Sequence, residues 1–238
     1  MNASMKVAIA ASIGALGLAF ASMPVASADD AKVGVILGFT GPIESLTPDM
    51  AESAELALKE VSDSGLLLGG TTLTPVRGDS TCIDSAAATA AAERLITSDN
   101  VVAIMGADCS GVTTAIASNV AVPNGVVMVS PSATSPALTT IEDDGYFFRT
   151  APSDARQGEV LAAILVDRGI MSVAVTYTNN DYGKGLSDSF EGAYMEMGGD
   201  VVAVAPHEDG KADYSAEVAA LASSGAEHLA VFGYVDQG

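Results

Sequence analysis

Residues 101–114 read VVAIMGADCSGVTT, so an apolar run that ends at Met105 is followed at once by small and hydroxyl-bearing residues. The same order recurs at residues 126–136, where VVMV precedes SPSATSP. Short apolar runs of this kind are typical of buried parallel strands, and open α/β sheets bind ligands at the carboxyl ends of their strands. Both polar segments are therefore predicted to lie at the ligand-binding edge of one parallel sheet.

Apolar runs alternate with amphipathic or alanine-rich stretches along the chain, a pattern that predicts an α/β fold with mainly parallel sheets. The first series has strands at 32–37, 72–76, 101–105, 126–129 and 147–150, with helices at 49–62, 84–97 and from 110. The second has helices at 154–168, 182–197 and 214–222, with strands at 172–176, 201–205 and 228–232. Asp154 is expected to cap the first of these helices. The two series predict an N-terminal lobe at 29–150 and a second lobe at 151–238, with a ligand crevice between them.

Residues 1–28 have the features of a secretory signal peptide. Lys6 precedes an apolar run at 7–20, and Ala26-Ser27-Ala28 provides a small-residue cleavage site. The run is short for a membrane span, and no cysteine lies at the site for lipid attachment. The chain is therefore expected to be cleaved after Ala28 and to be a free periplasmic protein without membrane insertion.

Charge and cysteine content narrow the possible partners. The formal net charge of −20 opposes binding to nucleic acid or anionic lipid. Cys82 and Cys109 are the only cysteines, and an even pair in an exported chain favours one disulfide. A metal site is the weaker alternative, because His207 and His228 do not stand at metal-ligand spacing from either cysteine. No metal or cofactor is expected.

Catalytic motifs are absent from the sequence. Residues 183–185 lack the spacing and hydroxyl of a phosphate loop, and residues 38–42 lack the dinucleotide fingerprint. Residues 107–111 do not form the serine-hydrolase elbow, since the first glycine is missing and no histidine partner is evident. The chain is predicted not to be an enzyme.

With these catalytic motifs excluded, the remaining interpretation is that polar residues bind a carboxylate by hydrogen bonds. Ser110 stands at a predicted helix start, where backbone amides are free and carry partial positive charge. Thr134 and the amides of residues 132–134 offer further donors. The alternative interpretation is that these are ordinary turn and cap residues.

Nine segments, taken in order, resemble the leucine/isoleucine/valine-binding family of periplasmic proteins over the whole length after the signal peptide. They are 33–42, Cys82, 109–110, 130–139, 148–150, 157–158, 181–185, 213–215 and 233–234. The resemblance implies a type I periplasmic binding protein fold, in which two doubly wound parallel-sheet lobes close on a ligand by a hinge. It also implies delivery of the ligand to an ABC permease in the inner membrane.

The resemblance assigns roles by position. Ser110 resembles the family's carboxylate ligand, and Ser132 and Thr134, with Ala133 between them, resemble positions that meet the ligand's carboxylate and amino groups. Tyr182 and Tyr234 match second-lobe tyrosines that close over the ligand. Cys82 and Cys109 match the family's disulfide, which would hold the loop that carries Ser110.

The chain departs from the family pattern in two places. Residues 43–48, IESLTP, stand where the family often has a tyrosine, so the wall that faces the ligand side chain is expected to differ. The sequence also stops at Gly238, before the second-lobe acidic residue that would receive the ligand's amino group, so the fold is expected to be C-terminally incomplete.

Three functions are compatible with these observations. The favoured one is a periplasmic solute-binding protein of an ABC importer, which binds an amino acid or similar small carboxylate between two lobes. The second is a ligand-sensing receptor domain of the same fold that controls a signalling or regulatory partner. The third, an exported hydrolase, requires a base within reach of Ser110.

Overall fold

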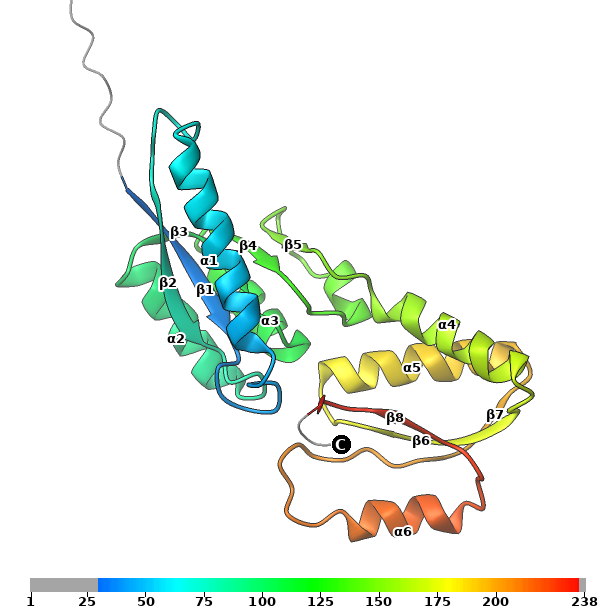
Figure 1. Cartoon of the computed structure of the whole chain (residues 1–238). Helices are drawn as coiled ribbons and strands as arrows, with labels where there is room; N and C mark the ends of the chain where they lie inside the picture. The colour runs from blue at the N-terminus through cyan, green and yellow to red at the C-terminus, as the bar shows by residue number, and fades with distance from the viewer. Residues whose placement is uncertain (1–29, 236–238) are drawn as a thin grey trace, which may run out of the picture.

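The computed structural model describes residues 30–235, and its first part is a five-stranded parallel sheet (Figure 1). The strand order is β2-β1-β3-β4-β5, and each neighbouring pair is parallel. The strands are β1 (Ala31–Leu37), β2 (Leu73–Asp79), β3 (Val101–Gly106), β4 (Val127–Ser130) and β5 (Phe147–Arg149). Because all five run in one direction, their carboxyl ends and the loops that follow lie at one edge. The predicted signal peptide at 1–28 lies outside the described residues.

Helices cover both faces of this sheet. They are α1 (Thr47–Ser64), α2 (Ser85–Thr97), α3 (Ser110–Ile116), which continues as the π-helical turn η1 (Ala117–Ala121), and the 3-10 turn η2 (Pro136–Thr139). Ile36 packs in the cluster that includes α2 and α3, whereas Val35 and Leu37 on either side of it pack against α1. This alternation, expected for a strand buried on both faces, sets the direction in which the loop after β1 leaves the sheet.

A second parallel sheet follows in the chain, with the order β7-β6-β8. Its elements are α4 (Asp154–Asp167), β6 (Ser172–Tyr177), α5 (Asp181–Glu196), β7 (Asp200–Val204), α6 (Ser215–Ser223) and β8 (Leu229–Phe232). Figure 1 shows α4 and α5 on one side of this sheet and α6 on the other. Phe190 and Tyr194 of α5 are fully buried and anchor the core on the α5 side.

The α/β organisation predicted from the sequence is confirmed, and each predicted strand is present with ends shifted by at most three residues. The predicted lobe boundary at 150 and 151 falls between β5 and α4, while the division into two lobes that move separately stays a prediction. The prediction that Asp154 caps α4 is wrong. Ser153 is the cap, because its Oγ accepts a hydrogen bond from Ala155 N, and Asp154 is the first residue of the helix. Among residues 30–235, none of the helices has the length and apolar character needed to cross a lipid bilayer.

The side of the second sheet that carries α6 is only thinly covered. Helix α6 has no buried residue, and Val218 of α6 and Val231 of β8 are 59% and 58% exposed. Together with Leu221 and Leu229 they border a groove of ≈ 310 Å³ between α6 and the sheet. A partly apolar groove beside the edge strand β8 favours association with other polypeptides.

We expect the polypeptide 29–238 to self-associate through this groove, because association removes apolar surface from water. Its thermal transition should depend on protein concentration, and replacing both Val218 and Val231 by lysine should weaken that dependence and reduce binding of a hydrophobic dye. Leu66→Lys is the matched control, since Leu66 is 87% exposed in the loop after α1, far from the groove in sequence and outside its lining. A cooperative transition that is independent of concentration in the unsubstituted polypeptide would contradict this expectation.

Candidate functional site

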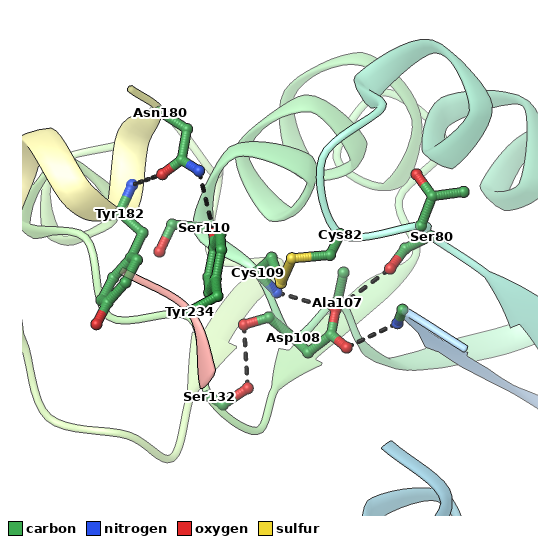
Figure 2. Close-up of a disulfide and its surroundings, with 12 residues drawn as sticks. Ser80, Cys82, Ala107, Asp108, Cys109, Ser110, Ser132, Asn180, Tyr182 and Tyr234 are labelled. Carbon is green, nitrogen blue, oxygen red and sulfur yellow. Dashed lines mark hydrogen bonds between the residues drawn. A yellow bond between two sulfur atoms is a disulfide. The ribbon is translucent and has the colours of Figure 1, made fainter. Parts of the chain in front are cut away.

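A cleft of ≈ 250 Å³ lies where the carboxyl-end loops of the first sheet meet the start of α5 and the end of β8 (Figure 2). Five of the six predicted ligand-binding residues line it: Ser110, Ser132, Thr134, Tyr182 and Tyr234. The sixth, Ala133, is fully buried in the core of the first sheet. The remaining lining residues are Ile43, Leu46, Met50, Asp108, Cys109 and Gln157. Residues far apart in sequence, from both sheets, therefore meet around one space.

The buried carboxylate of Asp108 holds the loops of the first sheet together at this edge. Its Oδ2 accepts a hydrogen bond from Gly38 N at 2.7 Å, and its Oδ1 accepts from Cys109 N at 2.9 Å and from Ser80 Oγ at 3.2 Å. Burial raises the pKa of Asp108, while the hydrogen bonds from Gly38, Cys109 and Ser80 oppose that rise. One side chain thereby connects the segments that follow β1, β2 and β3.

The chain can place Asp108 here only because Gly106 ends β3. Gly106 has a φ of 134°, and a Cβ at this position would lie 2.0 Å from the carbonyl oxygen of Ile36 on the neighbouring strand. Any larger residue would push β3 away from β1. The glycine at the end of β3 is therefore a packing requirement.

The predicted disulfide joins Cys82 to Cys109 across a sequence separation of 27. Cys82 belongs to the loop after β2, and Cys109 occupies the position just before α3. Figure 2 shows the bridge beside Asp108, on the opposite side from Ser132. The start of α3 is thus fixed both by a covalent bond and by the Asp108 hydrogen bonds.

Serine hydroxyls connect the loop after β4 to the loop after β3. Ser130 Oγ donates to the carbonyl of Ala107 at 2.5 Å and accepts from Ala133 N at 3.0 Å. Ser132 Oγ donates to the carbonyl of Asp108 at 3.0 Å. Ser132 and Thr134 therefore keep a defined position at the cleft.

Ser110 makes the third connection, with its hydroxyl oxygen as the acceptor. Ser110 Oγ accepts from Thr134 N at 3.2 Å and from Ser135 N at 3.1 Å. Because a hydroxyl has two acceptor lone pairs and one proton, the Ser110 O–H is left to donate elsewhere. The amides of Ala133 and Thr134, expected to be free donors, are instead engaged by Ser130 and Ser110.

Tyrosine rings from the second sheet close one side of the cleft. Tyr182 lies in the first turn of α5 and Tyr234 follows β8, and their rings stack with centroids 5.3 Å apart. Tyr234 also packs against the core of the first sheet, so it bridges the two parts of the chain. Burial raises the pKa of Tyr234 well above its usual range, and the neighbouring charge of Asp209 adds to the effect.

Asn180 positions both rings and was not anticipated from the sequence. Its Oδ1 accepts from Tyr182 N and Gly183 N at 3.1 Å, which caps α5, and its Nδ2 donates to the Tyr234 hydroxyl at 3.2 Å. The sequence feature that could have identified Asn180 is its position directly before the expected helix, where asparagine is a preferred cap.

A buried acid behind the cleft was also missed as a functional candidate. Asp154 is only 1% exposed, and neither of its carboxylate oxygens has a hydrogen-bond partner among the described residues. Burial raises its pKa, while the nearby hydroxyl of Thr134 and the charge of Arg149 oppose the rise. Thr134 is close enough to act on this charge, although its hydroxyl does not reach proper hydrogen-bond geometry with either oxygen.

Part of the cleft lining is apolar. Ile43, Leu46 and Met50 come from the segment expected to differ from the family pattern and from the first turn of α1. Ile43 is buried, Met50 is half-buried and Leu46 is exposed. The lining of the cleft therefore combines hydroxyl groups with aliphatic side chains.

His207 makes its contacts beside the second sheet. His207 Nδ1 lies 2.8 Å from Thr176 Oγ1, and the His207 ring contacts the edge of Tyr214. His207 lines the groove beside α6, and it is not among the residues that line the cleft with Ser110. Within residues 30–235 no group of three or more His, Cys, Asp or Glu side chains is arranged to hold a metal ion.

Comparisons with known proteins agree on one family. The family model described as "Periplasmic binding protein" matches residues 30–238. The Leu/Ile/Val-binding protein homolog 3 of Brucella melitensis is 32% identical over 234 residues, which are 98% of this chain and 60% of that protein. This chain thus spans about 60% of the length of that relative.

Solved structures of binding proteins are also similar to this chain. A leucine binding protein from Thermotoga maritima superposes with a TM-score of 0.72 at 28% identity, covering 84% of this chain and 55% of that one. A branched-chain amino acid transporter substrate binding protein from Streptococcus pneumoniae, solved in complex with isoleucine, gives a TM-score of 0.72 at 27% identity, covering 85% and 56%.

Replacing Asp108 by alanine should reduce the free energy of unfolding by at least about 3 kcal/mol, because three buried donors lose a charged acceptor. Urea unfolding followed by circular dichroism measures this change. Asp167→Ala is the control: Asp167 is exposed at the end of α4, and its replacement should change stability by no more than about 0.5 kcal/mol. Similar unfolding midpoints for both variants would show that Asp108 does not hold the loops together.

Removing the disulfide by replacing both cysteines with serine should lower stability by roughly 3 to 4 kcal/mol, as expected for a loop of this length. The same loss should appear when the unsubstituted protein is unfolded with a reducing agent present. If the reducing agent leaves the unfolding midpoint unchanged, the bridge contributes nothing to stability.

Proposed function

This chain belongs to the periplasmic binding protein family, and from that membership we propose that it binds an amino acid or similar small carboxylate in the cleft between its two sheets. The observation that carries the proposal is the composition of that cleft. Hydroxyl groups held at the carboxyl ends of β3 and β4 line it together with aliphatic side chains, and so do the two stacked tyrosines, Tyr182 of α5 and Tyr234 after β8. These features suit a ligand with one polar end and one apolar end.

The carboxylate of the ligand is held by Ser110. Both lone pairs of its hydroxyl oxygen are occupied by the amides of Thr134 and Ser135, so its proton is available for an anionic acceptor. Ser110 also begins α3, where backbone amides not used within the helix carry partial positive charge. Charge-assisted bonds of this kind contribute about 1.5 to 3 kcal/mol each.

The side chain of the ligand lies against Ile43, Leu46 and Met50. An aliphatic wall of this kind favours an aliphatic side chain, because burying apolar groups contributes about 25 cal/mol per Å². This agrees with the isoleucine present in the related structure from Streptococcus pneumoniae. Ile43 and Leu46 belong to the segment that departs from the family pattern, so we propose that the choice among aliphatic side chains differs from that of the relatives.

The role that follows is transport, with no chemical step. We propose that the protein works in the periplasm, that Tyr182 and Tyr234 close over the ligand, and that the closed form delivers it to an ABC permease of the inner membrane. Ser132 and Thr134 complete the polar wall, since the serine network holds both at the cleft.

Isothermal titration of the purified chain with leucine, isoleucine, amides, urea-like compounds and aromatic acids tests the proposal. An aliphatic amino acid should bind best, and Ser110→Ala should weaken that binding about tenfold or more, because one charge-assisted hydrogen bond is lost.

Ser85→Ala is the matched control, because Ser85 is also the first residue of a helix but is exposed. Its replacement should leave affinity unchanged. Affinity of the Ser110 variant within twofold of the parent would show that the carboxylate binds elsewhere. Failure of every compound to bind would contradict the proposed function itself.

A further inference from the structure

A network of polar side chains joins the loops that follow β6 and β7. The backbone brings these loops together, since Asn179 N donates to the carbonyl of His207 at 2.8 Å and Thr178 forms a parallel bridge with His207. Asp209 lies two residues further along the second loop, and its Oδ1 accepts a hydrogen bond from the Thr178 hydroxyl. Its Oδ2 accepts from Asn180 Nδ2 at 3.0 Å. Asp209 therefore fixes the segment between β6 and α5 at two points.

The amide group of Asn180 connects Asp209 to Tyr234. Asn180 Oδ1 accepts from the backbone N–H groups of Tyr182 and Gly183, so its Nδ2 faces the other way. On that side Nδ2 donates to the Tyr234 hydroxyl at 3.2 Å (Figure 2). Tyr234 lines the cleft, whereas Asp209 does not. Asp209 is thus separated from a residue of the cleft by one amide group.

The charge of Asp209 determines how this amide is oriented. Three acceptors lie within reach of the two protons on Asn180 Nδ2: Asp209 Oδ2, the Thr178 hydroxyl oxygen at 3.2 Å and the Tyr234 hydroxyl oxygen. A charged acceptor forms the strongest hydrogen bond, so Asp209 takes one proton and sets the plane of the amide. The other proton is left for a hydroxyl oxygen. Without the carboxylate, the amide is free to turn away from Tyr234.

We propose that Asp209 is a positioning residue for ligand binding, which acts through Asn180 to fix the Tyr234 ring at the cleft. This inference rests on the proposed function and deepens it, because it identifies a residue outside the cleft on which the closing tyrosines depend. Tyr234 stacks on Tyr182 and packs against the core of the first sheet, so its orientation affects both rings and the contact between the two sheets. Asp209 thereby resembles Asp108, whose carboxylate connects the loops of the first sheet.

The hydrogen bond to its hydroxyl gives Tyr234 a fixed point that stacking does not provide. Stacked aromatic rings tolerate a range of offsets, whereas a hydrogen bond holds one atom in place. Hydrogen bonds in a chain polarise one another, so the charge of Asp209 strengthens the Asn180 donor. Burial raises the pKa of Tyr234 and the charge of Asp209 adds to the rise, so the phenol keeps its proton beside the ionised acid. A ring held in this way loses less conformational entropy when a ligand binds.

The test is Asp209→Asn, measured by isothermal titration of the full chain with leucine and with isoleucine. Asparagine keeps the shape of the side chain but has one carbonyl oxygen, so it cannot hold Thr178 and Asn180 at separate oxygens. Affinity should fall about fivefold, the loss expected for one hydrogen bond. Glu208→Ala is the matched control and should leave affinity unchanged, because Glu208 is exposed in the same loop and accepts from Asn179 instead.

A double-mutant cycle with Tyr234→Phe distinguishes positioning of the ring from a general effect on the loop. Phenylalanine keeps the ring but has no hydroxyl for Asn180. In this background Asp209→Asn should therefore change affinity by less than about twofold. Thr178→Val, which removes the other hydroxyl held by Asp209, should give the same pattern and decides the question if Asp209→Asn does not fold.

The outcomes separate the two proposals. Unchanged affinity of Asp209→Asn in the parent background would overturn the inference and leave the proposed function intact. An equal loss of affinity in the parent and Tyr234→Phe backgrounds would also overturn it, because Asp209 would then act independently of the Tyr234 hydroxyl. If neither leucine nor isoleucine binds the parent protein, the proposed function fails and the inference fails with it.

Discussion

The hydrogen bonds to the Asp108 carboxylate are the interaction on which the rest of the site depends. They connect the loop after β1, the loop after β2 and the start of α3 through Gly38, Ser80 and Cys109. The disulfide to Cys82 runs beside them, so the same junction is held by covalent and by polar contacts. The position of Ser110, one residue further along, follows directly from this junction. The second layer of serine contacts, made by Ser130 and Ser132, then fixes the loop after β4 against it.

Much of this arrangement could be predicted from the sequence, because it follows from the order of apolar runs. Short apolar segments in the sequence predict strands such as β3 and β4. Because parallel strands end at the same edge of a sheet, the polar residues that follow them lie close together. In the structure Ser110, Ser132 and Thr134 line one cleft, and their role in ligand binding stays a prediction. The sequence could not show which hydrogen bonds these residues already make, since that depends on side-chain directions and not on position along a strand. The engaged amides of Ala133 and Thr134 are an example.

Asp154 and Asn180 illustrate a second limit. Both stand at helix starts, where aspartate and asparagine are common for local reasons, so their types carry no functional signal. Asn180 does cap its helix and holds Tyr234 as well, whereas Asp154 leaves the capping to Ser153 and is buried behind the cleft. Only tertiary packing distinguishes the two cases.

The two amides that bind Ser110 Oγ have a consequence for the entropy lost when a ligand binds. A serine hydroxyl in solution rotates freely, and a ligand that captures it must stop that rotation. Here the amides of Thr134 and Ser135 set the orientation of the oxygen before any ligand arrives. The donor is preorganised, so less conformational entropy is lost at the moment of binding. In the proposed function, this rigid donor favours a carboxylate in line with it, and a displaced or rotated carboxylate gains little from it.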